Sequence, residues 1–152
     1  MNFLIIGNMR KILSILVFVG LFGCDKDNEI KNYHFEIKNS SDKNVIIKTY
    51  ASYLPNELQK TIIINAGDTY KEIIEEYGSN SPSFSEFLKG DSIVITYQDL
   101  NKEIFTCFQT NLNNGCSELR NILTQYDNSI LDSNNTLRSY TITQADYDNA
   151  ND

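Results

Sequence analysis

Histidine and cysteine are scarce in this chain of 152 residues, which has a single histidine, His34, and three cysteines. A catalytic triad needs a histidine beside a nucleophile and an orienting acid, but the sequence marks no partner for His34 and contains no Gly-x-Ser-x-Gly motif. A zinc site draws on several imidazole or thiolate ligands, and no Cys-x-x-Cys pair is present. We therefore expect His34 to face solvent, and we expect no enzymatic activity, no metal and no cofactor.

Tryptophan is absent altogether. Sugar-binding surfaces often present exposed tryptophan, so its absence counts against a glycan site, and most of the nine tyrosines and eight phenylalanines are expected in the core or on strand surfaces. Glu72, Glu75 and Glu76 offer carboxylates, but a glycoside-cleaving pair needs a defined separation across a cleft. Three acids within five residues more often form a solvated face.

Basic residues are also few, with 13 Lys and Arg against 20 Asp and Glu. Two of the basic residues, Arg10 and Lys11, lie in a leader that we expect to be removed, which leaves 11 basic residues and a formal charge of −9 from residue 24 onward. Such a charge repels phosphate backbones, so we expect no nucleic-acid partner. It argues equally against adsorption of the folded part onto anionic lipid, and we expect that part to stay in water.

No apolar run reaches the roughly 20 residues that a spanning helix needs, and Ile12–Phe22 is about half that length. This run follows Arg10 and Lys11 and ends in Leu-Phe-Gly-Cys, which is the pattern of a lipoprotein signal peptide. Phe22 departs from the usual small or aliphatic residue before the glycine. We predict a signal peptide over residues 1–23 with lipid attachment at Cys24; the alternatives are an ordinary anchor with an incidental cysteine, and a true start at Met9 rather than Met1.

Two cysteines remain, Cys107 and Cys116, separated by a polar segment with a turn signal. In an exported chain an even pair of cysteines is expected to be oxidised. We predict a disulfide between them, with free buried thiols and a metal pair as the alternatives.

Alternating apolar and polar residues, bounded by Asn, Ser, Asp and Gly, predict short strands along the rest of the chain. The expected strands cover residues 33–38, 45–53, 61–64, 69–77, 92–97, 103–108 and 138–142. The first two are expected to pair as a hairpin across residues 39–44, and residues 92–97 and 103–108 as a second hairpin. The strand at 69–77 has some helical character because of its three glutamates, residues 117–126 suit either a helix or an extended segment, and residues 127–135 are expected to be a polar loop.

Two short helical turns are expected from capping-box patterns. Ser83 with Glu86 begins one turn, which Gly90 ends, and Thr143 with Asp146 begins another. Because no long amphipathic helix interrupts the strands, the predicted fold is all-β: a single immunoglobulin-like β-sandwich over residues 33–152 with short terminal helical turns. Its core is expected to hold these residues: Phe35, Ile37, Val45, Ile47, Ile62, Ile64, Ile93, Ile95, Ile104 and Phe105.

Several short motifs in the folded part, together with the leader, resemble the small lipoproteins of Bacteroidota. These are Phe-x-Ile-x-Asn-x-Ser at 35–41, Asp-Ser-Ile-Val-Ile at 91–95, Arg-Asn-Ile-Leu at 120–123 and Tyr-x-Ile-Thr-x-x-Asp-Tyr-x-x-Ala at 140–150. The resemblance implies an envelope location and a β-rich domain, and it implies no activity. Residues 24–32 form an acidic tether, in which Asp25, Lys26 and Asp27 resemble the export signal that sends some of these lipoproteins to the outer face of the outer membrane.

The sequence thus predicts a lipid-anchored protein of the outer membrane, on its surface or its periplasmic face, with a binding or structural accessory role. Its partners are the membrane, through the anchor, and an envelope protein or a glycan. The first alternative is a surface module that captures glycan or protein beside an outer-membrane transporter, which a contiguous exposed aromatic patch would favour. The second is a small periplasmic enzyme or inhibitor, which a deep pocket gathering His34 or paired acids would favour.

Overall fold

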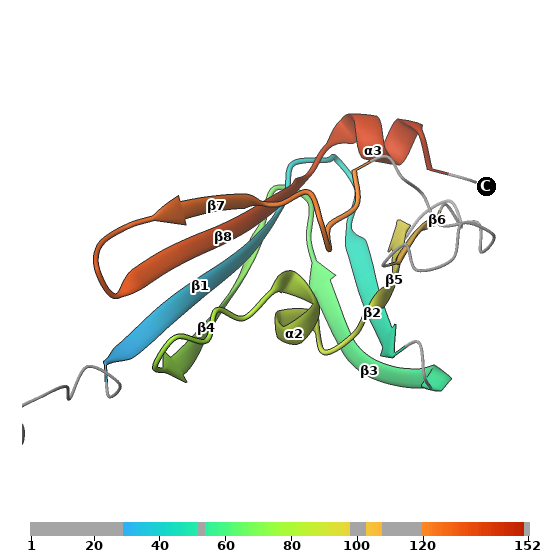
Figure 1. Ribbon diagram of the computed structural model, residues 1–152. Helices are drawn as coiled ribbons and strands as arrows, with labels where there is room; N and C mark the ends of the chain where they lie inside the picture. The colour runs from blue at the N-terminus through green and yellow to red at the C-terminus, as the bar shows by residue number, and fades with distance from the viewer. Residues whose placement is uncertain (1–28, 52–53, 98–102, 108–119, 151–152) are drawn as a thin grey trace, which may run out of the picture.

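The computed structural model describes residues 29–51, 54–97, 103–107 and 120–150 and confirms the all-β prediction (Figure 1). Two sheets and two short helices make up this part of the chain. The elements are β1 (Ile30–Asn39), β2 (Val45–Ala51), β3 (Leu54–Ile64), β4 (Thr69–Tyr77), α2 (Phe84–Leu88), β5 (Ser92–Tyr97), β6 (Glu103–Cys107), β7 (Asp127–Ile130), β8 (Asn135–Ile142) and α3 (Gln144–Asp148). No helix in the described ranges is long and apolar enough to cross a membrane.

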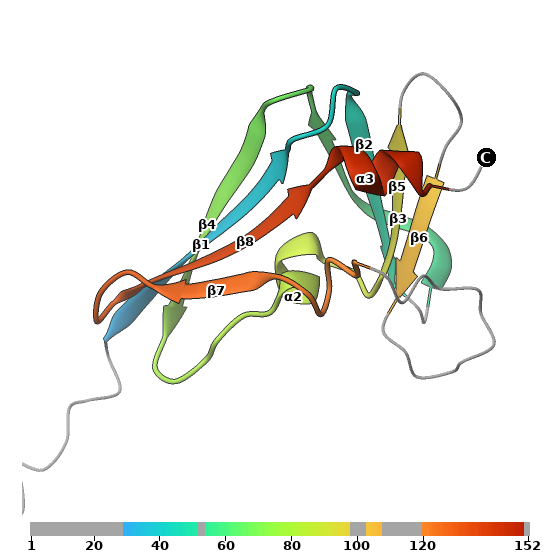
Figure 2. The ribbon, with the colours of Figure 1, turned by 90° about the horizontal axis from the view of Figure 1, so that it is seen from above.

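The strands form two four-stranded sheets. Sheet A has the order β4-β1-β8-β7 and sheet B the order β3-β2-β5-β6. All neighbouring strands are antiparallel except β1 and β8, which run parallel, with Phe35 opposite Arg138. The sheets meet at one end and diverge toward the other (Figures 1 and 2).

The two sheets are joined where β1 continues into β2 and β3 into β4, an arrangement we call the double corner. The predicted hairpin between the first two strands is therefore wrong, because β1 pairs with β4 and β8 while β2 pairs with β3 and β5. Residues 40–44 change sheets instead of reversing the chain within one sheet. The predicted hairpin of β5 and β6 is confirmed by their antiparallel pairing.

The side chain of Asn39 joins the two turns of the double corner and is fully buried. Its amide nitrogen donates to the carbonyl oxygens of Lys43, Ile64 and Asn65 at 2.7, 3.2 and 3.1 Å. Its amide oxygen accepts from the backbone N–H and the hydroxyl of Ser41 at 3.1 and 2.7 Å. The backbone of Asn39 adds a bond from its own N–H to Asp68 and accepts one from Gly67, whose positive φ of 80° suits glycine.

Helix α2 lies between the diverging sheets (Figures 1 and 2). Phe84, Phe87 and Leu88 are fully buried. The ring of Phe87 stacks on that of Phe35 in sheet A, with centroids 4.6 Å apart, and the hydroxyl of Thr49 in sheet B donates to the carbonyl of Leu88 at 2.7 Å. The five-residue helix thus supplies apolar side chains that fill the space between the sheets.

Eight of the ten predicted core residues are buried between the sheets. They are Phe35, Ile37, Val45, Ile47, Ile62, Ile64, Ile93 and Ile95. The side chains of the other two, Ile104 and Phe105, lie outside the described part of the chain.

Both predicted helical turns are confirmed, each with a complete capping box. Ser83 accepts from the backbone of Glu86, whose carboxylate accepts from the backbone of Ser83, and Thr143 and Asp146 do the same for α3. Helix α2 ends at Lys89, which adopts the left-handed conformation with φ 56°. The next position, residue 90, requires glycine, because its backbone lies so close to Tyr50 that a Cβ there would stand 2.6 Å from the Tyr50 carbonyl oxygen.

One strand was not predicted. Residues 127–135 were expected to be a polar loop, but Asp127–Ile130 forms β7, which pairs with β8. All four residues of β7 are exposed. The strand therefore needs no apolar side chains at alternate positions, and its sequence lacks the pattern by which strands are predicted. The uncertain strand at 69–77 is confirmed as β4.

Candidate functional site

The residues predicted to attach lipid or direct export lie outside the described part of the chain. Cys24, Asp25, Lys26 and Asp27 all precede it. Cys116 is likewise outside, and Cys107 contributes its backbone to β6 while its side chain is not described. The lipid anchor, the export signal and the disulfide therefore stay predictions.

The histidine and the acidic cluster considered from the sequence do not come together. His34 is half-buried in β1, and its Nε2 lies 3.0 Å from Oδ1 of Asn135, which is fixed in turn by Asp132. The strand pleat separates the three glutamates of β4: Glu72 and Glu76 are partly buried, and Glu75 is exposed. Within the described residues, no three His, Cys, Asp or Glu side chains are placed to hold a metal ion.

Glu72 instead takes part in a polar contact between the two sheets. Lys60 of β3 donates to the Glu72 carboxylate at 2.7 Å and to the Phe87 carbonyl at 3.1 Å, and its ammonium lies 4.4 Å from the centre of the Phe87 ring. Tyr70 donates to the same carboxylate oxygen at 2.7 Å. Burial acts to raise the pKa of Glu72, but the hydrogen bonds from Lys60 and Tyr70 and the charge of Lys60 outweigh it and lower that pKa.

The lowered pKa of Glu72 predicts a loss of stability in acid. The stabilisation is present above the ordinary glutamate pKa of 4.5 and is lost as the pH falls through the lower folded value. Replacing Glu72 by glutamine should cost about 1 kcal/mol at pH 7, reduced by partial exposure, and little at low pH. Denaturant unfolding between pH 3 and 7 measures this, with Glu75→Gln, an exposed change of the same charge on the same strand, as the control. Equal effects of the two variants would contradict it.

A buried arginine lies on the other side of α2. Arg138 of β8 is 7% exposed, and its guanidinium carbon lies 5.2 Å from the Tyr33 ring centre and 5.8 Å from those of Phe35 and Tyr126. Its Nη2 donates to the Ser81 hydroxyl at 2.6 Å. The three aromatic rings stabilise the guanidinium charge, and the bond to Ser81 fixes β8 against the loop that leads into α2.

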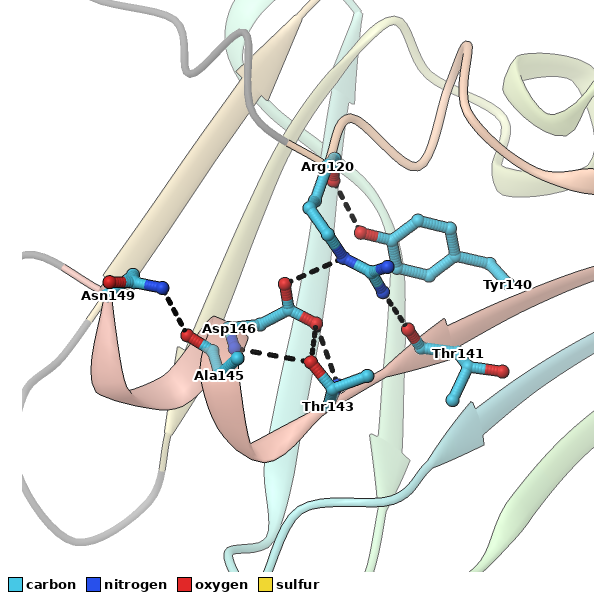
Figure 3. Close-up of polar contacts among 7 residues, drawn as sticks. All are labelled: Arg120, Tyr140, Thr141, Thr143, Ala145, Asp146 and Asn149. Atoms are coloured by element: carbon cyan, nitrogen blue, oxygen red, sulfur yellow. Dashed lines mark hydrogen bonds and ion pairs between the residues drawn. The ribbon is translucent and has the colours of Figure 1, made fainter.

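A second ionic contact fastens the C-terminal helix α3 (Figure 3). Asp146 is 7% exposed; it accepts from Nε of Arg120 at 2.8 Å and from the backbone and hydroxyl of Thr143 at 2.7 and 2.9 Å. Arg120, in the left-handed conformation with φ 58°, also donates to the Thr141 carbonyl and accepts from the hydroxyl of Tyr140. Burial and the charge of Asp146 raise the pKa of Tyr140 to about 12, so this hydroxyl keeps its proton at neutral pH.

The sequence predicts only one of the two partners in the ionic contact of Figure 3. The capping box identifies Asp146, but nothing marks Arg120, 26 residues earlier, as its partner. The carboxylate of Asp146 accepts hydrogen bonds from Arg120 and Thr143. These bonds fix α3 against the turn at residue 120, so we assign Asp146 a structural role.

Exposed apolar residues are the remaining candidates for contact with a partner. The described part has seven large ones: Ile30, Leu58, Ile63, Ile73, Tyr77, Ile130 and Leu131. Tyr77 is the one aromatic among these seven, so they do not form an aromatic platform for sugar. Four of them, Ile30, Tyr77, Ile130 and Leu131, lie at the end of sheet A where β1 begins, and we call these four the apolar rim.

Comparison with known proteins adds no relative: the chain matches no protein-family model, no curated protein and no solved structure.

Proposed function

We propose that this protein is a lipid-anchored component of the bacterial outer membrane with a binding or structural accessory role, attached through Cys24. The observation that carries the proposal is the order of segments at the start of the chain: a basic pair, a short apolar run, Gly23 and Cys24, then an acidic tether. The first strand begins at Ile30, six residues after Cys24, so the expected tether of residues 24–32 is too long by three residues, because residues 30–32 belong to β1. A folded domain so close to the lipid is suited to a fixed position on a membrane.

The ionisable groups of the described domain support a non-catalytic role. Lys60 and Glu72 contact each other between the sheets, and Arg120 and Asp146 contact each other beside α3. The shallow hollow next to α2 is lined by Ala51, Ser85, Glu86, Lys89, Gly90 and Asp91, and the carboxylate of Glu86 is already occupied by the α2 cap.

Replacing Cys24 by serine tests the anchor, because serine cannot receive the thioether-linked lipid. The wild-type protein is expected to partition into the detergent phase of a phase-separating detergent, and its mass should include the acyl chains and lack the leader. The mass of the Cys24→Ser variant should include the leader and lack the acyl chains. Cys107→Ser is the matched control, since it removes a cysteine that we do not assign to the anchor and should still partition into detergent. A wild-type protein that is soluble without detergent would refute the anchor.

Protease treatment of intact and lysed cells then shows which membrane face carries the domain. If the Asp25-Lys26-Asp27 segment is an export signal, the domain is digested in intact cells, and replacing these three residues by alanine protects it until lysis. Protection of the wild-type domain in intact cells would refute the export signal and place the protein on the periplasmic face.

A further inference from the structure

The apolar rim lies where the anchor attaches. Ile30 stands opposite Tyr77 in the pairing of β1 with β4. Ile130 and Leu131 lie where the β7–β8 hairpin turns, and the backbone of Asn32 in β1 bonds to Asn134 in that same turn. Figure 1 shows the β7–β8 turn and the start of β1 at the same end of sheet A, away from the double corner.

All four side chains of the rim are exposed, and Ile130 is the most exposed large apolar residue in the described part of the chain. Ile130 is 81% exposed, Tyr77 64%, Leu131 56% and Ile30 41%. Adjacent apolar side chains that protrude from a hairpin turn indicate a contact surface. The opposite end, at the double corner, presents exposed polar groups such as Asp42, Asn65 and Asp68 together with the exposed Ile63.

The length of chain between Cys24 and Ile30 limits how far the rim can lie from the membrane. Six residues span at most about 20 Å when fully extended. If Cys24 carries the lipid, the start of β1 is therefore held within that distance of the bilayer surface. Ile30 of the rim is the first residue of β1, Tyr77 stands opposite it, and Ile130 and Leu131 lie two strands away at the same end of sheet A. Tethering also raises the local concentration of bilayer around the rim, so that a contact too weak to act alone becomes populated.

We propose that the apolar rim inserts into the interfacial layer of the membrane that holds the anchor, so that sheet A stands with its β1 end toward the lipid. This inference rests on the lipid anchor proposed above. Ile130 and Leu131 supply apolar side chains, and Tyr77 supplies an amphipathic ring of the kind that favours the headgroup region.

The charge near the rim indicates which lipids it contacts. Glu29, Glu75 and Asp132 are exposed close to it, and carboxylates are repelled by anionic headgroups. The acidic character of the chain therefore excludes attraction to anionic lipid but not an apolar contact with zwitterionic lipid. The expectation that the whole folded part stays in water is revised for the rim alone.

The absence of tryptophan allows a direct test, because a single introduced indole is the only one in the chain. The lipidated full-length Ile130→Trp variant is reconstituted into phosphatidylcholine–phosphatidylethanolamine vesicles with or without brominated acyl chains, which quench indoles that reach them. The control is Ile63→Trp, at a position 65% exposed near the double corner. Both positions are exposed, so neither substitution is expected to disturb folding.

The proposal predicts that the indole at position 130 emits at shorter wavelength on vesicles and is quenched severalfold by the brominated lipid, while the indole at position 63 is unaffected. Adding Leu131→Asp to the first variant should reduce the quenching. Vesicle-bound protein with both indoles unquenched, or with both equally quenched, would overturn the rim contact and leave the anchor standing. Protein that does not float with the vesicles would overturn the anchor and this inference together. A concentration-dependent shift without vesicles would assign the rim to a second copy of the chain and also overturn the proposal.

Discussion

Replacing Asn39 by leucine is expected to lower the free energy of unfolding by about 3–5 kcal/mol. Leucine has the same branched shape, so no cavity forms, and the loss comes from the broken hydrogen bonds and from methyl groups that are larger than the amide atoms they replace. The carbonyl oxygen of Ile64 and the backbone N–H of Ser41 would each lose a buried partner, and the carbonyl oxygen of Asn65 a partly buried one. Equilibrium denaturant unfolding followed by far-ultraviolet circular dichroism measures the change.

The Asn39→Asp variant keeps the shape of the side chain and removes its hydrogen-bond donor, so it tests the hydrogen bonds at unchanged shape. Its second oxygen would face the carbonyl oxygens of Lys43, Ile64 and Asn65, which raises the pKa of the new carboxyl in the folded protein. Stability of this variant should therefore fall as the pH rises from about 4, the ordinary aspartate value, and recover in acid, where the protonated group donates again.

The control for both variants is Asn65→Ala at the same double corner. Asn65 is exposed and its side chain bonds only to Asp68 in the contacts described, so its loss should change stability by less than about 0.5 kcal/mol. If Asn39→Leu were no more destabilising than Asn65→Ala, the amide would not be what holds the double corner.

The second large effect is expected from Phe87→Ala in α2, with a loss of about 3–5 kcal/mol. The ring is fully buried, stacks on Phe35 with an interplanar angle of 12°, and meets Phe84 edge to face at 5.4 Å. Its removal leaves a cavity between the sheets and takes the aromatic face away from the ammonium of Lys60. The same denaturant unfolding experiment measures the loss.

Two variants show whether the Phe87 effect comes from packing. Phe87→Leu keeps most of the volume and should cost less than about 1.5 kcal/mol. Tyr77→Ala removes an aromatic ring that is 64% exposed and should cost about 0.5 kcal/mol or less in solution. Similar losses for Phe87→Ala and Phe87→Leu would mean that α2 does not fill the space between the sheets.

The sequence is sufficient for features that depend on neighbouring residues. The pairs Ser83 with Glu86 and Thr143 with Asp146 each lie three positions apart, so both helix starts are predictable. Strand β1 is predictable because Phe35 and Ile37 alternate with polar residues, and the same alternation correctly places both side chains in the core.

The pairing of β1 with β2 is predicted wrongly because alternation does not say which strands are neighbours. Polar residues such as Ser40 and Asp42 suit a hairpin turn and a sheet-changing turn equally. The difference depends on Asn39, whose partners Ile64 and Asn65 are 25 and 26 residues away. The contact of Lys60 with Glu72 is hidden for a similar reason, since it requires β3 and β4 to lie in different sheets.

The candidate sites were the least predictable part. The apolar rim brings together Ile30, Tyr77 and the Ile130–Leu131 pair, which are up to about a hundred residues apart in the chain and share no motif. Only the alignment of β1 with β4 and β8, and of β8 with β7, places them at one end of sheet A.

The parallel pairing of β1 with β8 has a consequence for how the molecule assembles. The contact between Asn32 and Asn135 spans 103 residues, and such long-range pairings slow folding because a large loop must close first. Strand β1 therefore lacks one of its two neighbours until β8 is present. During synthesis, sheet A therefore stays incomplete until residues 135–142 have been made, about a hundred residues after β1.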